Sequence, residues 1–131
     1  MLRKTILTAA ILGMLAVILG AFGAHGLTKI VSEKSMSIWN KGVLYHFIHT
    51  FAIVIVGLLS KQYPHKTLNY SFYLFLLGII FFSGSIYFLT FGEKLEWVKY
   101  LGPITPMGGM MFIGGWFSLF MYALKYKDDG K

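Results

Sequence analysis

Four long apolar stretches organise the chain, each without Asp, Glu, Lys or Arg, and the charged residues lie between them. They are residues 5–24, 43–60, 68–91 and 103–124, and each is 18 to 24 residues long. At about 1.5 Å per residue, a helix of that length crosses a hydrocarbon core roughly 30 Å thick. The stretches lack the alternating pattern of barrel strands. The pattern therefore predicts an all-α integral membrane four-helix bundle, with residues 1–131 forming a single membrane domain.

The composition agrees with a lipid environment. Hydrophobic residues make up 56% of the chain and charged residues 13%, against about 25% charged residues in a typical soluble domain. The net charge of +7 comes from Lys and Arg residues in the tails and loops, which favours the lipid bilayer over nucleic acid as a partner. The chain contains no cysteine, so disulfides and thiolate metal sites are excluded.

The start of the chain has two interpretations. Arg3 and Lys4 precede an apolar run that ends in small residues, as in a secretory signal peptide. The run from residue 6 to residue 22 is longer than the roughly 7 to 15 apolar residues of such a signal. We therefore expect an uncleaved first span, and cleavage after the Gly-Ala segment is the alternative.

Small residues are predicted to let the helices approach one another closely, as small-xxx-small faces do in membranes. In the first span, three of them are spaced four residues apart and share one helical face. The full set of predicted packing residues is Ala16, Gly20, Gly23, Ala24, Gly84, Gly108 and Gly109.

The distribution of positive charge indicates an orientation. Four spans place both termini on one side, which carries seven Lys and Arg residues against five on the other. The two residues beside the first span, Arg3 and Lys4, weigh most in the positive-inside rule. We expect a multi-pass protein of the cytoplasmic (inner) membrane with both termini in the cytoplasm.

The connection from His25 to Gly42 is the longest between spans. Apolar residues recur in it at roughly helical spacing, and lysines and a glutamate lie between them. This pattern predicts a short amphipathic helix on the membrane surface, with Trp39 as an interfacial anchor. An ordinary surface loop is the alternative.

Polar side chains within the spans gather at one depth. Odd spans end and even spans begin on the same side of the membrane, so these residues are expected in a single leaflet. The predicted cluster comprises His25, His46, His49, Ser83, Ser85, Tyr87 and Thr105.

This cluster allows three interpretations. The hydroxyls and imidazoles could bond to one another and to backbone carbonyls, which would hold the helices together. Alternatively, His25, His46 and His49 could bind a small molecule such as a quinone or a lipid headgroup, or coordinate a metal or haem iron. His46 and His49 form a HxxH pair without Cys or carboxylate ligands, which is a weak metal motif. We expect no cofactor.

The spans contain no Asp or Glu, so the carboxylate relay common in ion-coupled transporters is missing. A Ser-His-Asp set cannot be assembled inside the membrane, and an enzyme is therefore unsupported.

Four segments together resemble one family. They are GAFGAHGL at residues 20–27, Trp39 followed by Tyr-His and His-Thr-Phe-Ala at residues 45–52, FFSGSIY at residues 81–87, and LGPITPMGGMMFIGGW at residues 101–116. In this order they are similar to the small bacterial membrane proteins catalogued as domain of unknown function 423. The resemblance covers nearly the whole chain and implies a four-span helical membrane protein. It implies no reaction.

Three functions are therefore expected as alternatives. The first is a non-enzymatic membrane protein whose polar cluster serves helix packing or the binding of a partner, either a second copy or another membrane protein. The second is a binder of a small molecule or cofactor through His25, His46 and His49. The third is an oligomeric transporter of small solutes.

Overall fold

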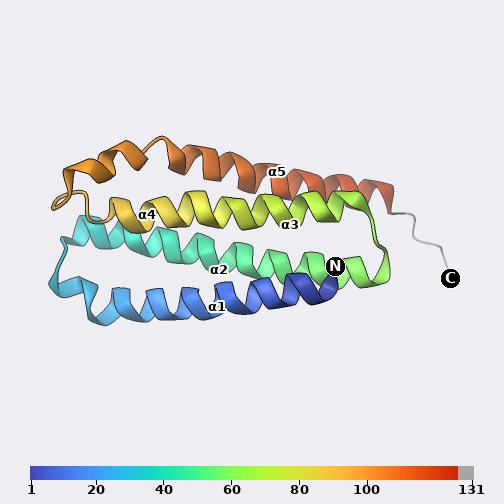
Figure 1. Cartoon of the computed structure of the whole chain (residues 1–131), viewed down its shortest axis with the longest axis horizontal. Helices are drawn as coiled ribbons and strands as arrows, with labels where there is room; N and C mark the ends of the chain where they lie inside the picture. Colours follow the sequence, from blue (N-terminus) through green and yellow to red (C-terminus); the bar gives the residue numbers. More distant parts are fainter. Residues whose placement is uncertain (127–131) are drawn as a thin grey trace.

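The computed structural model describes residues 1–126, and it consists of long helices (Figure 1). Four of these are long and apolar enough to cross a membrane: Leu2–Lys29, Glu33–Gln62, Lys66–Leu89 and Glu96–Lys125. This finding confirms the predicted all-α class with four candidate spans. The individual elements are α1 (Leu2–His25), η1 (Leu27–Lys29), α2 (Glu33–Gln62), α3 (Lys66–Gly78), η2 (Ile79–Ser83), α4 (Gly84–Leu89), η3 (Glu96–Leu101) and α5 (Ile104–Lys125).

The helices lie side by side in chain order (Figure 1). α1 packs against α2, and α2 packs against the third helix, which is the continuous run of α3, η2 and α4. α5 packs on the other side of this third helix. The N-terminus and the end of α5 lie at the same end of the molecule (Figure 1), as expected for an even number of antiparallel helices.

The predicted amphipathic helix on the membrane surface is wrong. α2 begins at Glu33 and continues without a break to Gln62, so residues 33–42 are its first turns. The hydroxyl of Ser32 caps this helix by accepting a hydrogen bond from the Ser35 N–H at 3.2 Å. An N-cap and an acidic residue start the helix at this point. Residues 33–62 contain no proline, so this segment and the span form one continuous helix.

Trp39 consequently has a different position from the one predicted. Its side chain is 3% exposed, and its indole N–H donates to the Leu19 carbonyl of α1 at 3.0 Å. A Cβ at Gly23 would lie 2.5 Å from the Trp39 Nε1, so this glycine provides the space for the indole. Trp39 therefore fastens α2 to α1.

At the contact between the third helix and α5, glycines of each helix leave space for phenylalanines of the other. A Cβ at Gly78 would collide with the Phe112 ring, and one at Gly115 would lie 2.5 Å from Phe75. A Cβ at Gly108 would collide with the backbone of Phe82. Since lipid provides no hydrophobic driving force between helices, such close packing supplies the attraction through van der Waals contacts.

Candidate functional site

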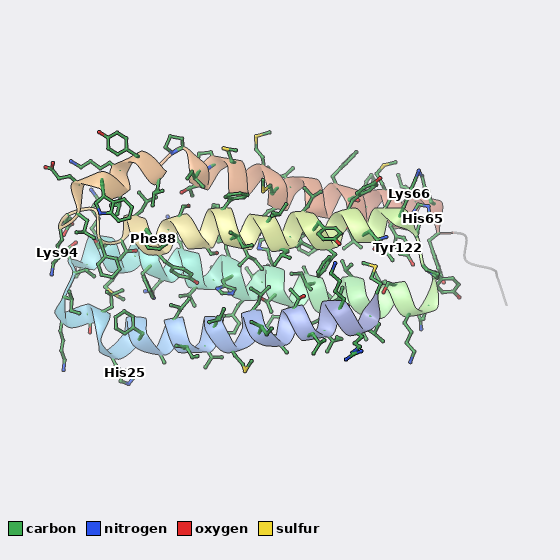
Figure 2. All side chains as sticks on the ribbon, in the orientation of Figure 1. His25, His65, Lys66, Phe88, Lys94 and Tyr122 are labelled. Carbon is green, nitrogen blue, oxygen red and sulfur yellow. The ribbon has the colours of Figure 1, made fainter. Side chains whose placement is uncertain are left out.

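His25 does not join the other two histidines of the predicted cluster. Its side chain is exposed and lies at the outer side of α1 (Figure 2), with Nδ1 3.3 Å from the Ala21 carbonyl of its own helix. Among residues 1–126, no three His, Asp or Glu side chains are close enough to hold a metal ion. Within these residues, His25 thus lies apart from His46 and His49, and the three histidines do not form a group that could hold a metal ion.

His49 has a hydrogen-bond partner on both ring nitrogens. Nδ1 lies 2.8 Å from the Tyr45 carbonyl, and Nε2 accepts the indole N–H of Trp116 at 3.2 Å. The imidazole also stacks on Phe112, with ring centroids 3.4 Å apart and planes inclined by 8°. A carbonyl can only accept and an indole N–H can only donate, so these partners define a neutral ring with its proton on Nδ1.

The hydroxyls of the predicted cluster join neighbouring helices. Ser83 donates to the Gly42 carbonyl of α2 at 2.8 Å. Ser85 and Thr105 share a hydrogen bond of 2.6 Å between α4 and α5. These side chains belong to the contacts that hold the bundle together and leave little polar chemistry for a ligand.

His46 is the exception. It is 3% exposed, and its Nδ1 lies 3.0 Å from the hydroxyl of Tyr87. Its Nε2 is the one buried side-chain nitrogen or oxygen within residues 1–126 that has no hydrogen-bond partner. The Leu12 carbonyl of α1 lies beside the imidazole without satisfying Nε2 in good geometry. Buried polar groups are paired in the great majority of cases, so this nitrogen requires an explanation.

A groove lies next to this imidazole. It has a volume of about 570 Å³, and His46 of α2 is one of the residues that line it. Leu12, Leu15 and Leu19 of α1 form one wall, and residues 79–88 of the third helix form most of the other. The wall is almost entirely apolar, and its rim includes the exposed Phe88 and Trp97. We call this feature the His46 groove; its size is typical of sites for small ligands.

Gly84 lines the His46 groove, and its role differs from the helix packing predicted for it. A Cβ at this position would meet nothing closer than the Ile79 carbonyl oxygen at 4.0 Å. Glycine inside a helix costs about 1 kcal/mol relative to alanine, and no close helix contact explains it here. The preceding turn, η2, is π-helical, and such turns are frequent at functional sites. Gly84 therefore widens the groove.

The other predicted packing residues differ in how closely a neighbouring helix approaches them. Ala16 is fully buried, and the Cβ of a residue at Gly20 would be 3.5 Å from Val43. Ala24 is exposed, so its predicted helix contact is not formed. A Cβ at Gly109 would be in ordinary contact with the Phe82 ring at 3.8 Å.

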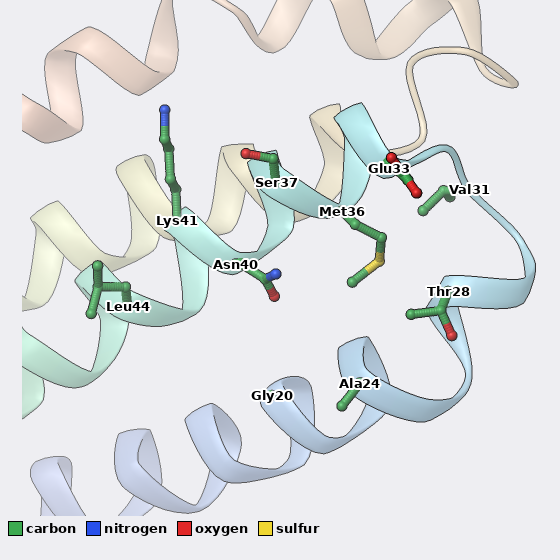
Figure 3. Close-up of a pocket in the computed structure, with 10 residues that line it drawn as sticks. All are labelled: Gly20, Ala24, Thr28, Val31, Glu33, Met36, Ser37, Asn40, Lys41 and Leu44. Atoms are coloured by element: carbon green, nitrogen blue, oxygen red, sulfur yellow. The ribbon is translucent and has the colours of Figure 1, made fainter.

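A second hollow of about 810 Å³ lies between the end of α1 and the start of α2. Gly20 and Ala24 leave space on α1, and Met36 and Asn40 point toward them from α2 (Figure 3). Lys41 points away from α1 (Figure 3). The mouth of this hollow is more polar than the His46 groove, but no unsatisfied buried group faces it within residues 1–126.

Two residues that matter for the site were missed at the level of sequence. Lys4 of α1 donates to the Tyr73 hydroxyl of α3 at 2.5 Å, and its ammonium lies 4.5 Å from the Tyr73 ring centroid. Trp116 of α5 donates its indole N–H to Nε2 of His49, as described above. Neither pairing has a signal in the sequence, because the residues are 69 and 67 positions apart.

Comparison with known proteins agrees with this architecture. The family described as "Protein of unknown function (DUF423)" matches residues 19–109. A UPF0382 membrane protein of Staphylococcus epidermidis is 44% identical over 125 residues, covering 95% of this chain and 98% of that protein. The UPF0382 membrane protein YwdK of Bacillus subtilis is 38% identical over 126 residues, with 95% and 99% covered.

A UPF0382 membrane protein of Haemophilus influenzae is 38% identical over 130 residues, covering 98% of this chain and 99% of that protein. No solved structure matches the chain. The chain belongs to the DUF423 family of membrane proteins.

Proposed function

We propose that this membrane protein binds a small, membrane-soluble molecule in the His46 groove and catalyses no reaction. The observation that carries this proposal is the unpartnered Nε2 of His46, a buried hydrogen-bonding atom beside an apolar groove. A ligand that pairs with this nitrogen would remove a penalty of about 1–3 kcal/mol. The open space beside Gly84 and the π-helical turn before it support the same location.

The remaining polar residues support a packing role. Ser83, Ser85, Thr105 and His49 all bond to groups of the protein, so a route for small polar solutes through the bundle has little support. Coordination of a metal or haem iron has less support than binding in the groove, because His25 lies apart from His46 and His49 is already bonded on both nitrogens.

The two walls of the groove are held together at one end. Lys4 and Tyr73 join α1 to α3, whereas farther along the helices Leu15 and Leu19 face residues 79–88 across the groove. A molecule dissolved in the bilayer can therefore enter sideways, past the exposed Leu15 and Phe88. We also infer that the protein resides in the cytoplasmic membrane with both termini inside, and that any partner, including a second copy, packs on the lipid-facing surface.

Two matched glycine variants test the proposal. Gly84→Leu places a side chain in the open space of the groove. Gly109→Leu makes the same change at a glycine that lines a different hollow. Each protein is purified from its membrane in mild detergent, checked for a single species by gel filtration, and analysed by native mass spectrometry and organic extraction.

We expect a near-stoichiometric small molecule with the wild-type protein and with Gly109→Leu, and its loss with Gly84→Leu. The proposal fails if the wild-type protein carries no such molecule and also binds no added apolar compound, or if Gly84→Leu retains the molecule at the wild-type level.

A further inference from the structure

We infer that the ligand of the His46 groove is an uncharged carbonyl compound with an apolar body, whose carbonyl oxygen accepts a hydrogen bond from the Nε2–H of His46. This inference rests on the proposed function and specifies the class of molecule that the groove takes. It follows from the hydrogen-bond donors and acceptors of His46 and Tyr87 and from the apolar character of the groove.

The first step concerns the proton on the His46 ring. Within residues 1–126, the Tyr87 hydroxyl has one side-chain partner, the Nδ1 of His46 at 3.0 Å. If the hydroxyl donates to Nδ1, then Nε2 carries the ring proton and one donor lacks a partner. If Nδ1–H donates to the phenol oxygen instead, both the Nε2 lone pair and the hydroxyl proton lack partners. Since each unmet group costs about 1–3 kcal/mol, the first arrangement is favoured.

The two histidines of the HxxH pair thus carry opposite tautomers. His49 holds its proton on Nδ1, because the Tyr45 carbonyl accepts it and the Trp116 indole occupies Nε2. His46 holds its proton on Nε2 and offers the groove a donor, without a lone pair for a metal ion. The partner that fits an N–H donor in an apolar site is a neutral acceptor.

The second step concerns the rest of the ligand. The leucines of α1 and the isoleucines and phenylalanines of the third helix line the groove, so a charged headgroup would be buried without a counter-charge. An alcohol would bring a donor of its own, for which the groove offers little beyond the phenol oxygen of Tyr87 and the hydroxyl of Ser85, which is already bonded to Phe82 and Thr105. A carbonyl adds an acceptor and no further donor. Two sources share this chemistry: the carbonyl of a lipid-soluble quinone and the ester carbonyl of a glycerolipid.

Access to the nitrogen requires a local movement. Nε2 is shielded from solvent, so a carbonyl reaches it after a side chain of the wall turns aside. Leu15 and Leu19 of α1 can do this, because both lie outside the narrow buried face that holds α1, which comprises Thr5, Ala9, Leu12, Ala16 and Gly23. Leu15 projects from outside this face and is 44% exposed.

The test uses three probes of equal chain length, 2-tridecanone, 2-tridecanol and tridecane, added to the protein in nanodiscs. Nitrogen-15 labelling of histidine reports the ring tautomer and the Nε2–H of His46 by NMR, and titration gives the affinity of each probe. We expect a protonated Nε2 whose signal shifts with the ketone, and ketone binding at least about fivefold tighter than that of the alkane or the alcohol, as one buried hydrogen bond provides.

Variants separate this hydrogen bond from the shape of the groove. His46→Leu should abolish the preference for the ketone, whereas His46→Gln should restore part of it, because an amide supplies an acceptor for Tyr87 and an N–H for the ligand. Gly84→Leu measures the background from partition into the bilayer. Organic extraction of the purified wild-type protein distinguishes the sources, since a quinone and a glycerolipid differ in mass and absorbance.

The outcomes separate the two proposals. If all three probes bind equally but Gly84→Leu prevents their binding, the groove is a site and the carbonyl assignment is wrong. A lone pair on Nε2 of His46 would also overturn the assignment. If no probe binds above the Gly84→Leu background and the extract contains no bound molecule, the proposed function itself fails.

Discussion

Trp116 of α5 donates its indole N–H to Nε2 of His49 on α2, with 3.2 Å between the two nitrogens. On the opposite side of the ring, His49 Nδ1 lies 2.8 Å from the carbonyl of Tyr45. The imidazole is therefore a bridge between two helices, held in one orientation by two hydrogen bonds and by stacking on Phe112. A metal ion or ligand could reach Nε2 only by breaking the bond to Trp116.

This bridge predicts the effect of removing the indole N–H. Trp116→Phe keeps an aromatic ring near Phe75 but leaves Nε2 of His49 without a donor. We expect a loss of about 0.5–2 kcal/mol of stability, the range for interhelical hydrogen bonds in membranes and buried unsatisfied groups. Thermal unfolding in one detergent measures it. Trp97→Phe is the control, because Trp97 is 55% exposed, and an equal loss in both variants would contradict the bridge.

Two glycines should respond to alanine with opposite signs. Gly108→Ala places a Cβ into the backbone of Phe82, and we expect a loss of about 1–3 kcal/mol from overpacking. Gly84→Ala places its Cβ in open space and should gain about 0.5–1 kcal/mol from helix propensity. Unfolding midpoints of the two variants, compared with the wild-type protein, check both. A destabilised Gly84→Ala protein would show that this glycine serves packing after all.

The sequence predicted the candidate spans better than the directions in which side chains face around each helix. The four spans followed from length and hydropathy, because these depend on the chain alone. His46 and His49 are three residues apart, which rotates them by about 60° around the helix. His46 therefore meets Tyr87, whereas His49 meets Phe112 and Trp116. Gly20 lies opposite Val43 and Gly23 lies opposite Trp39, so His25 is level with the first turns of α2, away from His46 and His49, and its side chain is exposed.

The roles of the glycines could not be read from the sequence for a related reason. Gly23 and Gly84 both occur in helices rich in small residues, yet one receives the indole of Trp39 and the other opens a groove. The difference depends on which side chain of another helix lies opposite. Trp39 was predicted at the membrane surface because a tryptophan near a span end is usually interfacial. Its burial depends on the absence of a Cβ at Gly23, 16 residues earlier.

The contact between Gly23 and Trp39 predicts non-additive mutations. Gly23→Ala would place a Cβ 2.5 Å from the indole Nε1, so the indole must move and its bond to the Leu19 carbonyl must weaken. We expect a loss of about 1–3 kcal/mol. Trp39→Leu removes the obstacle, so Gly23→Ala should cost at least about 1 kcal/mol less in that background. Equal costs in the two backgrounds, measured by unfolding in detergent, would contradict the direct contact.

The bond between Lys4 and Tyr73 should control the distance between the walls of the His46 groove. This pair joins α1 to α3, and α1 otherwise packs on α2. Tyr73→Phe removes the hydroxyl that accepts from Lys4, so α1 should sample a wider range of distances from the third helix. Because the chain has no cysteine, spin labels on Ile11→Cys and Leu77→Cys can report that distance without background labelling. We expect a broader distribution in Tyr73→Phe, and no change in Tyr70→Phe, which removes the same hydroxyl from an exposed tyrosine of α3. An unchanged distribution in Tyr73→Phe would mean that packing on α2 alone positions α1.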